Sequence, residues 1–473
     1  MSDERRVGTF VSGPSARSIA LRILLASQRT DHPLDELIDQ QASTISLPRD
    51  RALVMELAYG VLRQQEPIDW RLGAVLSKPL HRLPAFVQML LRLGAYQVLF
   101  LDRVPASAAV NETVKLAKAS AKQLGRDWSG LVNGVLRNLI RMPAPSLPDP
   151  VTHPAESLSI KYGIPVWLVV RWLNRMGLEQ TESACRATST VPNVTVRVNR
   201  CRLIREAFLK RMQEAGLAAH PTEVSPVGVV VEKGCEVTSL PGFMTGDFYV
   251  EDEAAQLISP ILDPLPHEVI LDACAAPGGK VTHLAELMGD RGMIVAVDQK
   301  ASRLDLLQDN CARLRIRSIV PVVGDARRHA QWTSLVVRDA DQPAIPTVFD
   351  RILVDAPCSG LGVLRRHPEA KELRSDSSFT RHQTLQVQIL ESVAPTLRPG
   401  GVLVYSTCST ETEETEGVVN RFCDTAPGWT RESVAPWLPS AAHRFVTPQG
   451  ALSTLCNSFG MDGFYAVRLR KNE

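Results

Sequence analysis

Three short apolar runs in the second half of the chain each end in a turn that carries reactive side chains. Val269–Asp272 leads into a glycine-rich turn, and the runs 352–354 and 402–404 lead to Cys358 and Cys408. Such runs are typical of strands that are buried on both faces of a parallel sheet. Open α/β sheets bind their ligands outside the carboxyl ends of these strands. The three turns are therefore expected at the ligand-binding edge of one sheet.

The part of the chain from about residue 246 to the end alternates between strand and helix patterns. We expect strands at 269–272, 293–298, 319–323, 349–355, 402–406 and 467–469. Helical patterns lie between most of them, and the helix predicted at 383–397 is ended by Pro399-Gly-Gly401. This alternation predicts an α/β fold with a doubly wound, Rossmann-like parallel sheet.

The earlier part of the chain has a different pattern. Apolar residues between 14 and 141 recur at spacings of three and four, as in Leu53, Leu57 and Val61, which predicts an all-α bundle. Prolines after Met142 cannot continue a helix. The predicted organisation is a disordered tail at 1–13, a helical domain at 14–141, a Pro-rich linker at 142–154, a small α+β module at 155–245 and the α/β domain at 246–473.

Basic residues are concentrated in the helical part, although the whole chain has a net charge of only +2. Residues 1–141 contain 19 Lys and Arg against 13 Asp and Glu, and residues 71–141 contain 11 against 3. A positive field of this kind suits a polyanion such as RNA. Solvated helix faces that happen to be basic would explain the same counts equally well.

The composition disfavours a membrane protein, a secreted protein and a metalloprotein. No run of about 18 apolar residues is present to span a bilayer, and no hydrophobic secretory segment follows the N-terminus. The nine cysteines are irregularly spaced and lack a Cys-x-x-Cys pair, which fits neither a disulfide framework nor a zinc site. We therefore expect a cytoplasmic protein with no metal and no membrane partner, and we take it to be a monomer.

The turn after 269–272 has the composition of a site for a nucleoside cofactor. Gly278 and Gly279 allow close approach of the backbone to a ligand, and the following helix offers free amide donors. The absence of Gly-x-Gly-x-x-Gly and Walker patterns disfavours dinucleotides and triphosphates. Asp298 ends the next strand, where an acid can bind ribose hydroxyls, and Asp325 follows the third strand, where it could accept from an adenine amino group. Taken alone, each aspartate could equally cap a helix.

Acids at successive strand ends after a glycine turn suit S-adenosyl-L-methionine, which combines adenosine with a cationic sulfonium. The candidate cofactor-binding residues are Cys274, Ala275, Ala276, Pro277, Gly278, Gly279, Lys280, Asp298, Asp325 and Asp355. Cys358 and Cys408 would lie beside this turn, and two thiols in that place suggest covalent chemistry on a base. The cysteines expected to pack in the core are Cys185, Cys201, Cys311, Cys423 and Cys456.

Three motifs resemble those of the RNA (cytosine-5)-methyltransferases of the Nop2/Nsun/Sun family: Asp272–Lys280, Val354–Lys371 and Tyr405–Ser409. The helical part, through 104–114 and 130–137, is similar to the NusB-like domain of the bacterial 16S rRNA (cytosine-5)-methyltransferase B. Further segments that resemble the family are 196–199, 246–256 and 462–464. The resemblance implies S-adenosylmethionine-dependent methylation of carbon 5 of a cytosine in RNA, with 16S ribosomal RNA as the expected substrate.

Carbon 5 of cytosine is too weak a nucleophile to take a methyl group from a sulfonium, and a thiolate that adds to carbon 6 makes it reactive. The resemblance implies that Cys408 is this nucleophile and that Cys358 assists removal of the carbon-5 proton and release of the product. DNA cytosine methyltransferases use a Pro-Cys thiol instead, which would nominate Cys358. The resemblance also implies that Asp355 binds the edge of the base and that Lys280 orients Asp355 or the base.

The chain departs from the family pattern at two places. Glu372 stands where a tryptophan is common, and Thr412-Glu-Glu-Thr-Glu416 replaces Pro-x-Glu-Asn-Glu. Arg365-Arg-His367 could contact RNA phosphates or simply add surface charge. Transfer RNA stays open as the substrate. A non-catalytic RNA-binding protein on the same fold is disfavoured, because both thiols and the acid of the Pro-Cys motif are present.

Overall fold

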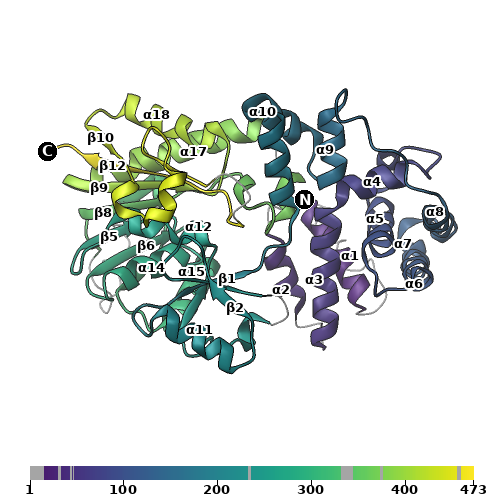
Figure 1. The fold of residues 1–473 in the computed structure, drawn as a ribbon, viewed down its shortest axis with the longest axis horizontal. Coiled ribbons are helices and arrows are strands. Elements are labelled where there is room, and N and C mark those ends of the chain that lie inside the picture. The colour runs from purple at the N-terminus through teal and green to yellow at the C-terminus, as the bar shows by residue number, and fades with distance from the viewer. Residues whose placement is uncertain are drawn as a thin grey trace. The chain divides into compact units, whose positions relative to one another are not determined.

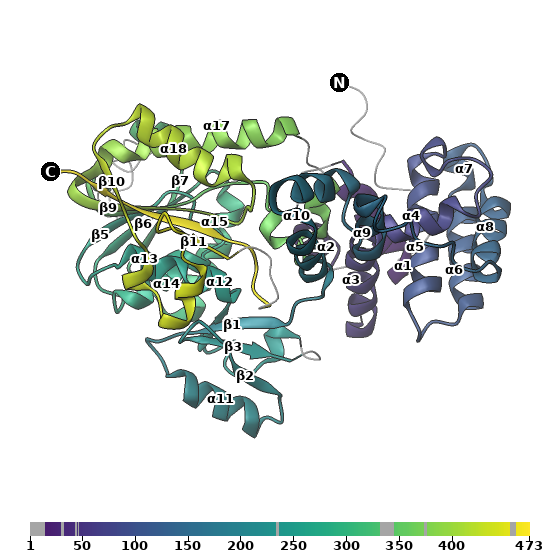
Figure 2. The same cartoon turned by 45° about the horizontal axis from the view of Figure 1, so that its top comes forward.

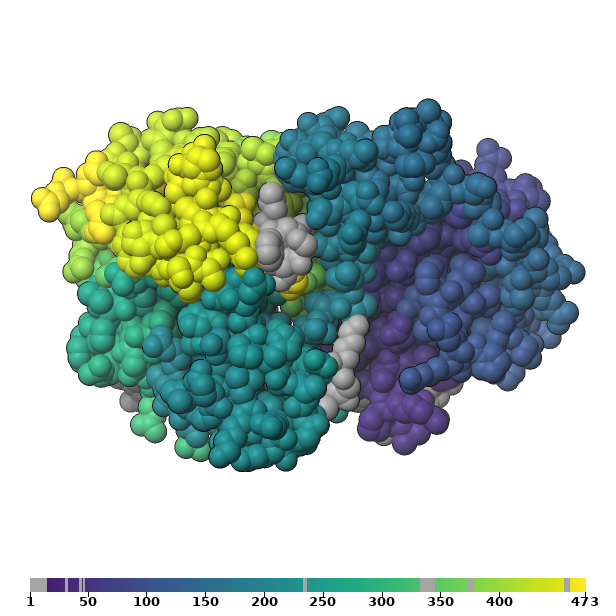
Figure 3. Space-filling model, in the orientation of Figure 1, coloured from purple at the N-terminus to yellow at the C-terminus, as the bar shows by residue number. Residues whose placement is uncertain are grey.

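The computed structural model describes residues 15–29, 33–42, 45, 47–232, 236–331, 345–372, 376–454 and 460–473. The tail predicted at 1–13 and Cys456 lie outside these residues. The chain divides into two compact units: Met1–Thr190 with Leu364–Leu373, and Val191–Val363 with Arg374–Glu473. Figure 1 and Figure 2 show their ribbons in two orientations. Figure 3 shows the surface of the protein in space-filling form, in the orientation of Figure 1.

The first unit is built from helices, as its apolar spacing predicts. Its helices are α1 (Ala16–Ser27), α2 (Leu34–Ala42), α3 (Pro48–Arg63), α4 (Gln65–Gly73), η1 (Leu80–Arg82), α5 (Ala85–Phe100), α6 (Ala106–Ala119), α7 (Ala121–Leu124), α8 (Ser129–Arg141), α9 (Pro154–Tyr162), α10 (Val166–Ser189) and η6 (Pro368–Glu372). Leu21 of α1, Leu57 of α3 and Leu90 of α5 are fully buried in one apolar core. Aliphatic side chains on successive helical turns therefore hold this unit together.

The segment Leu364–Leu373 belongs to the helical unit, although it follows the Cys358 turn in the sequence. Lys371 is buried, and its Nζ donates to the carbonyl oxygen of Gly163 at 2.6 Å and to that of Arg63 at 3.2 Å. Arg63 donates in turn to the carbonyl oxygen of Arg365 at 2.9 Å. The Arg365 side chain is also buried, so it does not lie on an exposed basic surface.

The contacts thus group α9, α10 and the segment Leu364–Leu373 with the helical bundle. The domain boundaries predicted above follow the sequence pattern instead, and they stay a prediction. The physical reason for the difference is that α9 packs against α4 and α10, while the carbonyl groups of the bundle bind Lys371.

The second unit begins with a small antiparallel sheet. Its strands are β1 (Val194–Val198), β2 (Ala219–Pro221), β3 (Gly228–Val231) and β4 (Phe248–Val250), in the order β2-β3-β1-β4, and α11 (Arg205–Glu214) accompanies them. Val196, Phe208 and Phe248 are fully buried between the helix and the sheet. A strand-and-helix module was predicted here, and the structure contains one.

Within the described residues, the main sheet of the second unit has eight strands. They are β5 (Val269–Asp272), β6 (Met293–Asp298), β7 (Ile319–Val323), β8 (Phe349–Asp355), β9 (Leu397–Thr407), β10 (Trp429–Glu432), β11 (Leu452–Ser453) and β12 (Tyr465–Lys471). The order is β10-β12-β9-β8-β5-β6-β7, with β11 paired to β12. Strands β5 to β9 are parallel, whereas β10 and β12 run antiparallel to their neighbours. The predicted α/β, Rossmann-like fold is confirmed, and the antiparallel edge is an addition to it.

Helices cover both faces of the main sheet. They are α12 (Glu253–Gln256), α13 (Ile258–Leu262), α14 (Gly279–Leu287) and α15 (Ala301–Leu314) in one apolar cluster, and α17 (Asp376–Val393) and α18 (Glu416–Thr425) in the other. The chain runs outward from β5 to β6 and β7, and then returns to β8 on the other side of β5. The ends of β5 and β8 therefore form the topological switch point, where sheets of this kind bind ligands.

Two negative findings concern the described ranges alone. No helix there has the length and the apolar character that crossing a membrane requires. No group of three or more His, Cys, Asp and Glu side chains there could hold a metal ion.

Candidate active site

A cavity of about 210 Å³ lies at the carboxyl ends of β5 and β8. Its lining consists of Tyr249, Val250, Glu251, Ala255, Asp272, Cys274, Ala275, Ala276, Pro277, Gly278, Gly279, Lys280 and Asp355. The whole predicted turn from Cys274 to Lys280 therefore faces one cavity at the switch point, together with Asp355 of β8.

The shape of the turn depends on its two glycines. Gly278 has φ 120°, a backbone conformation that L side chains rarely adopt. A Cβ atom on Gly278 would lie 2.7 Å from Leu307, and one on Gly279 would lie 2.9 Å from a Glu251 carboxylate oxygen. The helix α14 begins at Gly279 and points its first backbone amides toward the turn. The site can therefore bring backbone donors close to a ligand.

Asp272 ends β5 and is fully buried at the edge of the cavity. Its Oδ1 accepts from the Cys274 amide at 3.3 Å, while its Oδ2 has no hydrogen-bond partner. Burial, with a smaller contribution from Asp355, raises the pKa of Asp272 to about 7. A buried carboxylate oxygen without a partner suits a cationic group, and the ammonium of S-adenosylmethionine is such a group. We did not predict this residue, although it is the acid that ends the first strand.

The acids predicted for the nucleoside part lie outside the residues that line the cavity. Asp298 accepts from the Lys300 amide at 2.9 Å and forms an ion pair with Arg303 at 3.2 Å. Arg303 also donates to the carbonyl oxygen of Ala276, so it connects Asp298 to the turn. Asp325 binds Arg327, and hydrogen bonds from Arg327 lower the pKa of Asp325. The roles of Asp298 and Asp325 toward a cofactor stay predictions.

Lys280 and Asp355 form an ion pair across the cavity edge. The distance from Lys280 Nζ to Asp355 Oδ2 is 2.7 Å, and Asp355 Oδ1 accepts from Ser406 Oγ at 2.8 Å. Burial disfavours the charge on Lys280, but Asp355 outweighs this effect, and the pKa of Lys280 is raised. Lys280 Nζ also lies 4.8 Å from the ring centroid of Phe464. The pair holds the side chains of Lys280 and Asp355 in place beside the cavity.

The two thiols of the predicted pair meet in the structure. The distance between Cys358 Sγ and Cys408 Sγ is 3.3 Å, and the two cysteines follow the neighbouring strands β8 and β9. The hydrogen bond from the Cys408 thiol lowers the pKa of Cys358, and the same contact, with burial, raises the pKa of Cys408 well above its ordinary value. Cys358 is therefore the more readily ionised thiol of the pair.

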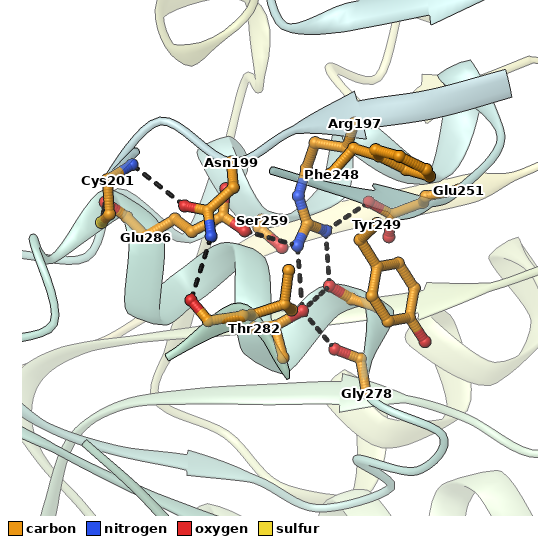
Figure 4. Close-up of polar contacts among 12 residues, drawn as sticks. Arg197, Asn199, Cys201, Phe248, Tyr249, Glu251, Ser259, Gly278, Thr282 and Glu286 are labelled. Atoms are coloured by element: carbon orange, nitrogen blue, oxygen red, sulfur yellow. Dashed lines mark hydrogen bonds and ion pairs between the residues drawn. The ribbon is translucent and has the colours of Figure 1, made fainter. Parts of the chain in front are cut away.

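An arginine of the small sheet holds the cofactor turn from outside (Figure 4). Arg197 of β1 is fully buried, and its Nη1 donates to Glu251 at 2.5 Å and to the carbonyl oxygen of Gly279 at 2.6 Å. Its Nη2 donates to Thr282 and Glu286 of α14, both at 2.9 Å. The small sheet thus fixes the start of α14. The predictions assigned no role to Arg197, because an arginine in a strand has no sequence signal that marks it as buried.

Of the remaining cysteines, Cys185 is buried, and Cys311 and Cys423 are partly buried. The prediction that Cys201 packs in the core is wrong, because Cys201 is exposed in the turn after β1. Its thiol donates to the carbonyl oxygen of Glu286 at 3.7 Å.

Comparison with known proteins identifies similar domains along most of the chain. Residues 259–470 match the family model of the 16S rRNA methyltransferases RsmB/F, residues 14–141 match the NusB family, and residues 164–238 match the ferredoxin-like domain of RsmF/B-like methyltransferases. The probable ribosomal RNA small subunit methyltransferase B of Bacillus subtilis is 34% identical over 97% of this chain and 99% of its own. The ribosomal RNA small subunit methyltransferase B of Pseudomonas syringae pv. tomato is 37% identical over 96% of each chain.

Two solved structures are also similar. The protein in the crystal structure of PH0851 has 25% sequence identity to this chain and a TM-score of 0.79. The match covers 97% of this chain and 99% of that protein. A methyltransferase homolog from Pyrococcus horikoshii has 25% sequence identity to this chain and a TM-score of 0.56. The match covers 67% of this chain and 99% of that protein.

Proposed function

This chain belongs to the RsmB/F family of 16S rRNA methyltransferases, and on that premise we propose that it methylates carbon 5 of a cytosine in 16S ribosomal RNA. The observation that carries the proposal is the thiol pair at 3.3 Å, on strands next to the cofactor turn. Cytosine-5 methylation needs one thiol to activate the base and a second group to release the product. We expect the enzyme to work as a monomer in the cytoplasm.

The residues of the cavity fit S-adenosylmethionine as the methyl donor. The turn from Cys274 to Gly279 would bind it through backbone amides, and Asp272 would receive its ammonium group. Asp298 would bind the ribose, and Asp325 would accept from the adenine. When bound, the cofactor supplies an electrophilic methyl group on its sulfonium.

Cys408 is proposed as the nucleophile, on the family resemblance. Its proton passes over the 3.3 Å contact to the Cys358 thiolate, and the freed Cys408 thiolate adds to carbon 6 of the cytosine. The electron pair of the carbon 5–carbon 6 bond then makes carbon 5 nucleophilic. Asp355, held by Lys280 and Ser406, binds the base near nitrogen 3 and the exocyclic amine, which stabilises the adduct.

Release of the product requires a base at the second thiol. Cys358 first loses its proton to solvent, and its thiolate then takes the proton from carbon 5. The electron pair of that C–H bond reforms the ring double bond, and the bond between Cys408 and carbon 6 breaks. Cys358 therefore acts as a base twice in one turnover, first toward the Cys408 thiol and then toward carbon 5.

The helical unit would provide the electrostatic attraction for RNA. Lys118, Lys122 and Arg137 are among the exposed basic side chains of α6, α7 and α8. Contacts of this kind to phosphates bind and position RNA, while the pocket selects the base that is turned out of the stack.

The proposal is tested by incubating the enzyme with labelled S-adenosylmethionine and separated pools of 16S ribosomal RNA and transfer RNA. We expect label in 16S ribosomal RNA, at one position that maps as 5-methylcytosine. Label in transfer RNA alone would assign the enzyme to transfer RNA. Absence of label from both pools would favour a non-catalytic RNA-binding protein.

A further inference from the structure

One buried carboxylate connects the two cysteine turns from behind. Glu414, at the end of η8 (Thr412–Glu414), is fully buried. Its Oε1 accepts from the Ser359 amide at 2.8 Å, and its Oε2 accepts from Ser409 Oγ at 2.5 Å and also from Ser359 Oγ. Ser359 directly follows Cys358, and Ser409 directly follows Cys408. A single side chain therefore binds the residue next to each thiol.

Glu414 is itself held by contacts from two elements of the fold, one to its main chain and one to its carboxylate. Tyr405 of β9 donates its hydroxyl to the Glu414 carbonyl oxygen at 2.6 Å. Gln386 of α17 donates to Glu414 Oε1 at 3.4 Å and to the carbonyl oxygen of Pro357 at 2.9 Å. His382, also on α17, has its Nδ1 3.3 Å from Oε1. These contacts hold the Glu414 side chain in one position.

Sheet pairing alone does not fix the distance between the thiols. The paired register of β8 and β9 ends at Asp355 and Ser406, before either cysteine is reached. Beyond that point, the amides of Ala356 and Gly362 donate to the carbonyl oxygens of Ser406 and Cys408, both at 2.8 Å. The hydroxyl oxygens of Ser359 and Ser409 lie 3.2 Å apart, and Glu414 accepts hydrogen bonds from both of these serines. Proton transfer between sulfur atoms depends steeply on their separation, so the connection matters for chemistry.

We propose that Glu414 is a positioning residue that holds the Cys358 and Cys408 turns together and keeps the two thiols within reach of one proton. It acts through Ser359 and Ser409, because it is fully buried and is not among the residues that line the cavity. The catalytic consequence rests on the proposed function, whereas the geometric consequence does not depend on it.

The geometric consequence can be measured without RNA or cofactor. Dibromobimane links two thiols that lie close together, and mass spectrometry identifies the linked peptides that contain Cys358 and Cys408. The variants are Glu414→Ala, Glu414→Gln and the control Glu413→Gln, which changes the partly exposed neighbour. We expect wild type and Glu413→Gln to link equally, and Glu414→Ala to link about tenfold more slowly.

Glu414→Gln should be intermediate. Its amide oxygen can still accept from the Ser359 amide, while its amino group can donate to the serine hydroxyls, which then act as acceptors. S-adenosylmethionine binding should be unchanged in all variants, because Glu414 does not line the cavity, and this measurement shows that each variant is folded.

The catalytic consequence follows in the same variants. Glu414→Ala should lower kcat about 100-fold and leave KM for RNA unchanged, with partial rescue in Glu414→Gln. Linking at the wild-type rate in a folded Glu414→Ala protein would overturn the proposal. If wild type itself transferred no methyl group while the linking results held, the proposed function would fail and the positioning role would stand.

Discussion

The core of the helical bundle and the carboxyl edge of the main sheet are both buried, but the first is built from apolar side chains and the second contains charged ones. Leu21, Leu57 and Leu90 pack between helices in an apolar core. The region around the sheet edge instead buries charged groups, among them Glu414 and, from the small sheet, Arg197. Apolar burial stabilises a fold by about 25 cal/mol per Å², whereas removing charges from water costs several kcal/mol unless partners compensate.

The difference shows what each region can tolerate. An apolar core loses stability in proportion to the atoms removed, and its function elsewhere survives if the fold does. A buried polar network loses the positions of its members when one is removed, because the remaining groups are left without partners. The following experiments test that contrast, from the largest expected effect to the smallest.

The largest effect is expected at the thiols. Cys408→Ala should abolish both methylation and covalent capture of RNA, with a rate loss of about 10⁴-fold or more, because the proposed nucleophile is gone. Cys358→Ala should also lose turnover but accumulate an RNA–protein adduct, because the release step is blocked. Denaturing gel electrophoresis with labelled RNA detects the adduct. An adduct in Cys408→Ala but not in Cys358→Ala would show that the two roles are reversed.

Next is the buried arginine of the small sheet. Arg197→Met should destabilise the second unit by about 3–5 kcal/mol, because Glu251 and Glu286 then stay buried without their cation. It should also weaken S-adenosylmethionine binding, since Gly279 loses a hydrogen bond. Denaturant unfolding and calorimetric titration measure the two effects. Arg200→Met, in the exposed turn two residues after the strand, is the matched control and should change neither.

A substitution in the apolar core of the helical unit should lower stability without affecting cofactor binding. Leu57→Ala should cost about 3 kcal/mol of unfolding free energy, from lost apolar burial and a residual cavity. Its affinity for S-adenosylmethionine should equal that of wild type. Met55→Ala on the exposed face of the same helix should have little effect on either quantity. A loss of cofactor affinity in Leu57→Ala would contradict the expectation that the apolar core of the helical unit affects stability alone.

A smaller effect concerns pH. Burial raises the pKa of Asp272 from 3.8 to about 7, so the folded protein holds this proton through a range in which the unfolded chain has lost it. The stability that the group contributes is present below pH about 4 and is lost as pH rises to about 7. Cofactor binding has the opposite requirement, because the ammonium group needs the ionised carboxylate.

S-adenosylmethionine affinity should therefore fall by up to tenfold for each unit of pH below about 7. Calorimetric titration of S-adenosylmethionine at pH values from about 5 to about 8, which lie on both sides of the pKa of Asp272, measures this dependence. Asp272→Asn should bind more weakly at high pH and show a flat profile. An unchanged slope in Asp272→Asn would mean that another group is responsible.

The smallest effect is expected at the surface of the bundle. Lys118→Gln should change the unfolding free energy by less than about 0.5 kcal/mol. It should lower RNA affinity and reduce the slope of log Kd against log salt by about one, if Lys118 contacts a phosphate. Lys210→Gln, an exposed lysine on α11 of the small module, should leave the slope unchanged. Equal slopes in all three proteins would place the RNA contacts away from α6.

Much of this molecule was predictable from local patterns. The strands at 293–298, 319–323 and 349–355 have the predicted ends, because apolar runs bounded by turn residues mark buried strands. Other boundaries moved: β9 begins at Leu397 rather than at 402, and α17 starts at Asp376 rather than at 383. The strand β10 was not predicted, since its pairing with β12 is a long-range contact at the edge of the sheet.

The reactive groups of the candidate site could be predicted from the sequence, whereas the buried residues that hold them in position could not. Cys358, Cys408 and the turn to Lys280 have motifs that can be recognised. Glu414 lies in an acidic run of the kind that is usually exposed, and only its contacts distinguish it from Glu413. The family resemblance alone assigned the roles of the two thiols, and that assignment remains to be tested.

The amino-acid sequence by itself determined which segments form helices and strands and which reactive side chains stand at the ends of strands. These follow from periodicity and from turn residues that act over a few positions. Tertiary structure decided which charged groups are buried and which of them meet. Arg197 and Glu286 are 89 residues apart in the chain, and Ser359 and Glu414 are 55 apart. Burial and charge pairing depend on such distant neighbours, because the local sequence sets neither the loss of water nor the partner that compensates for it.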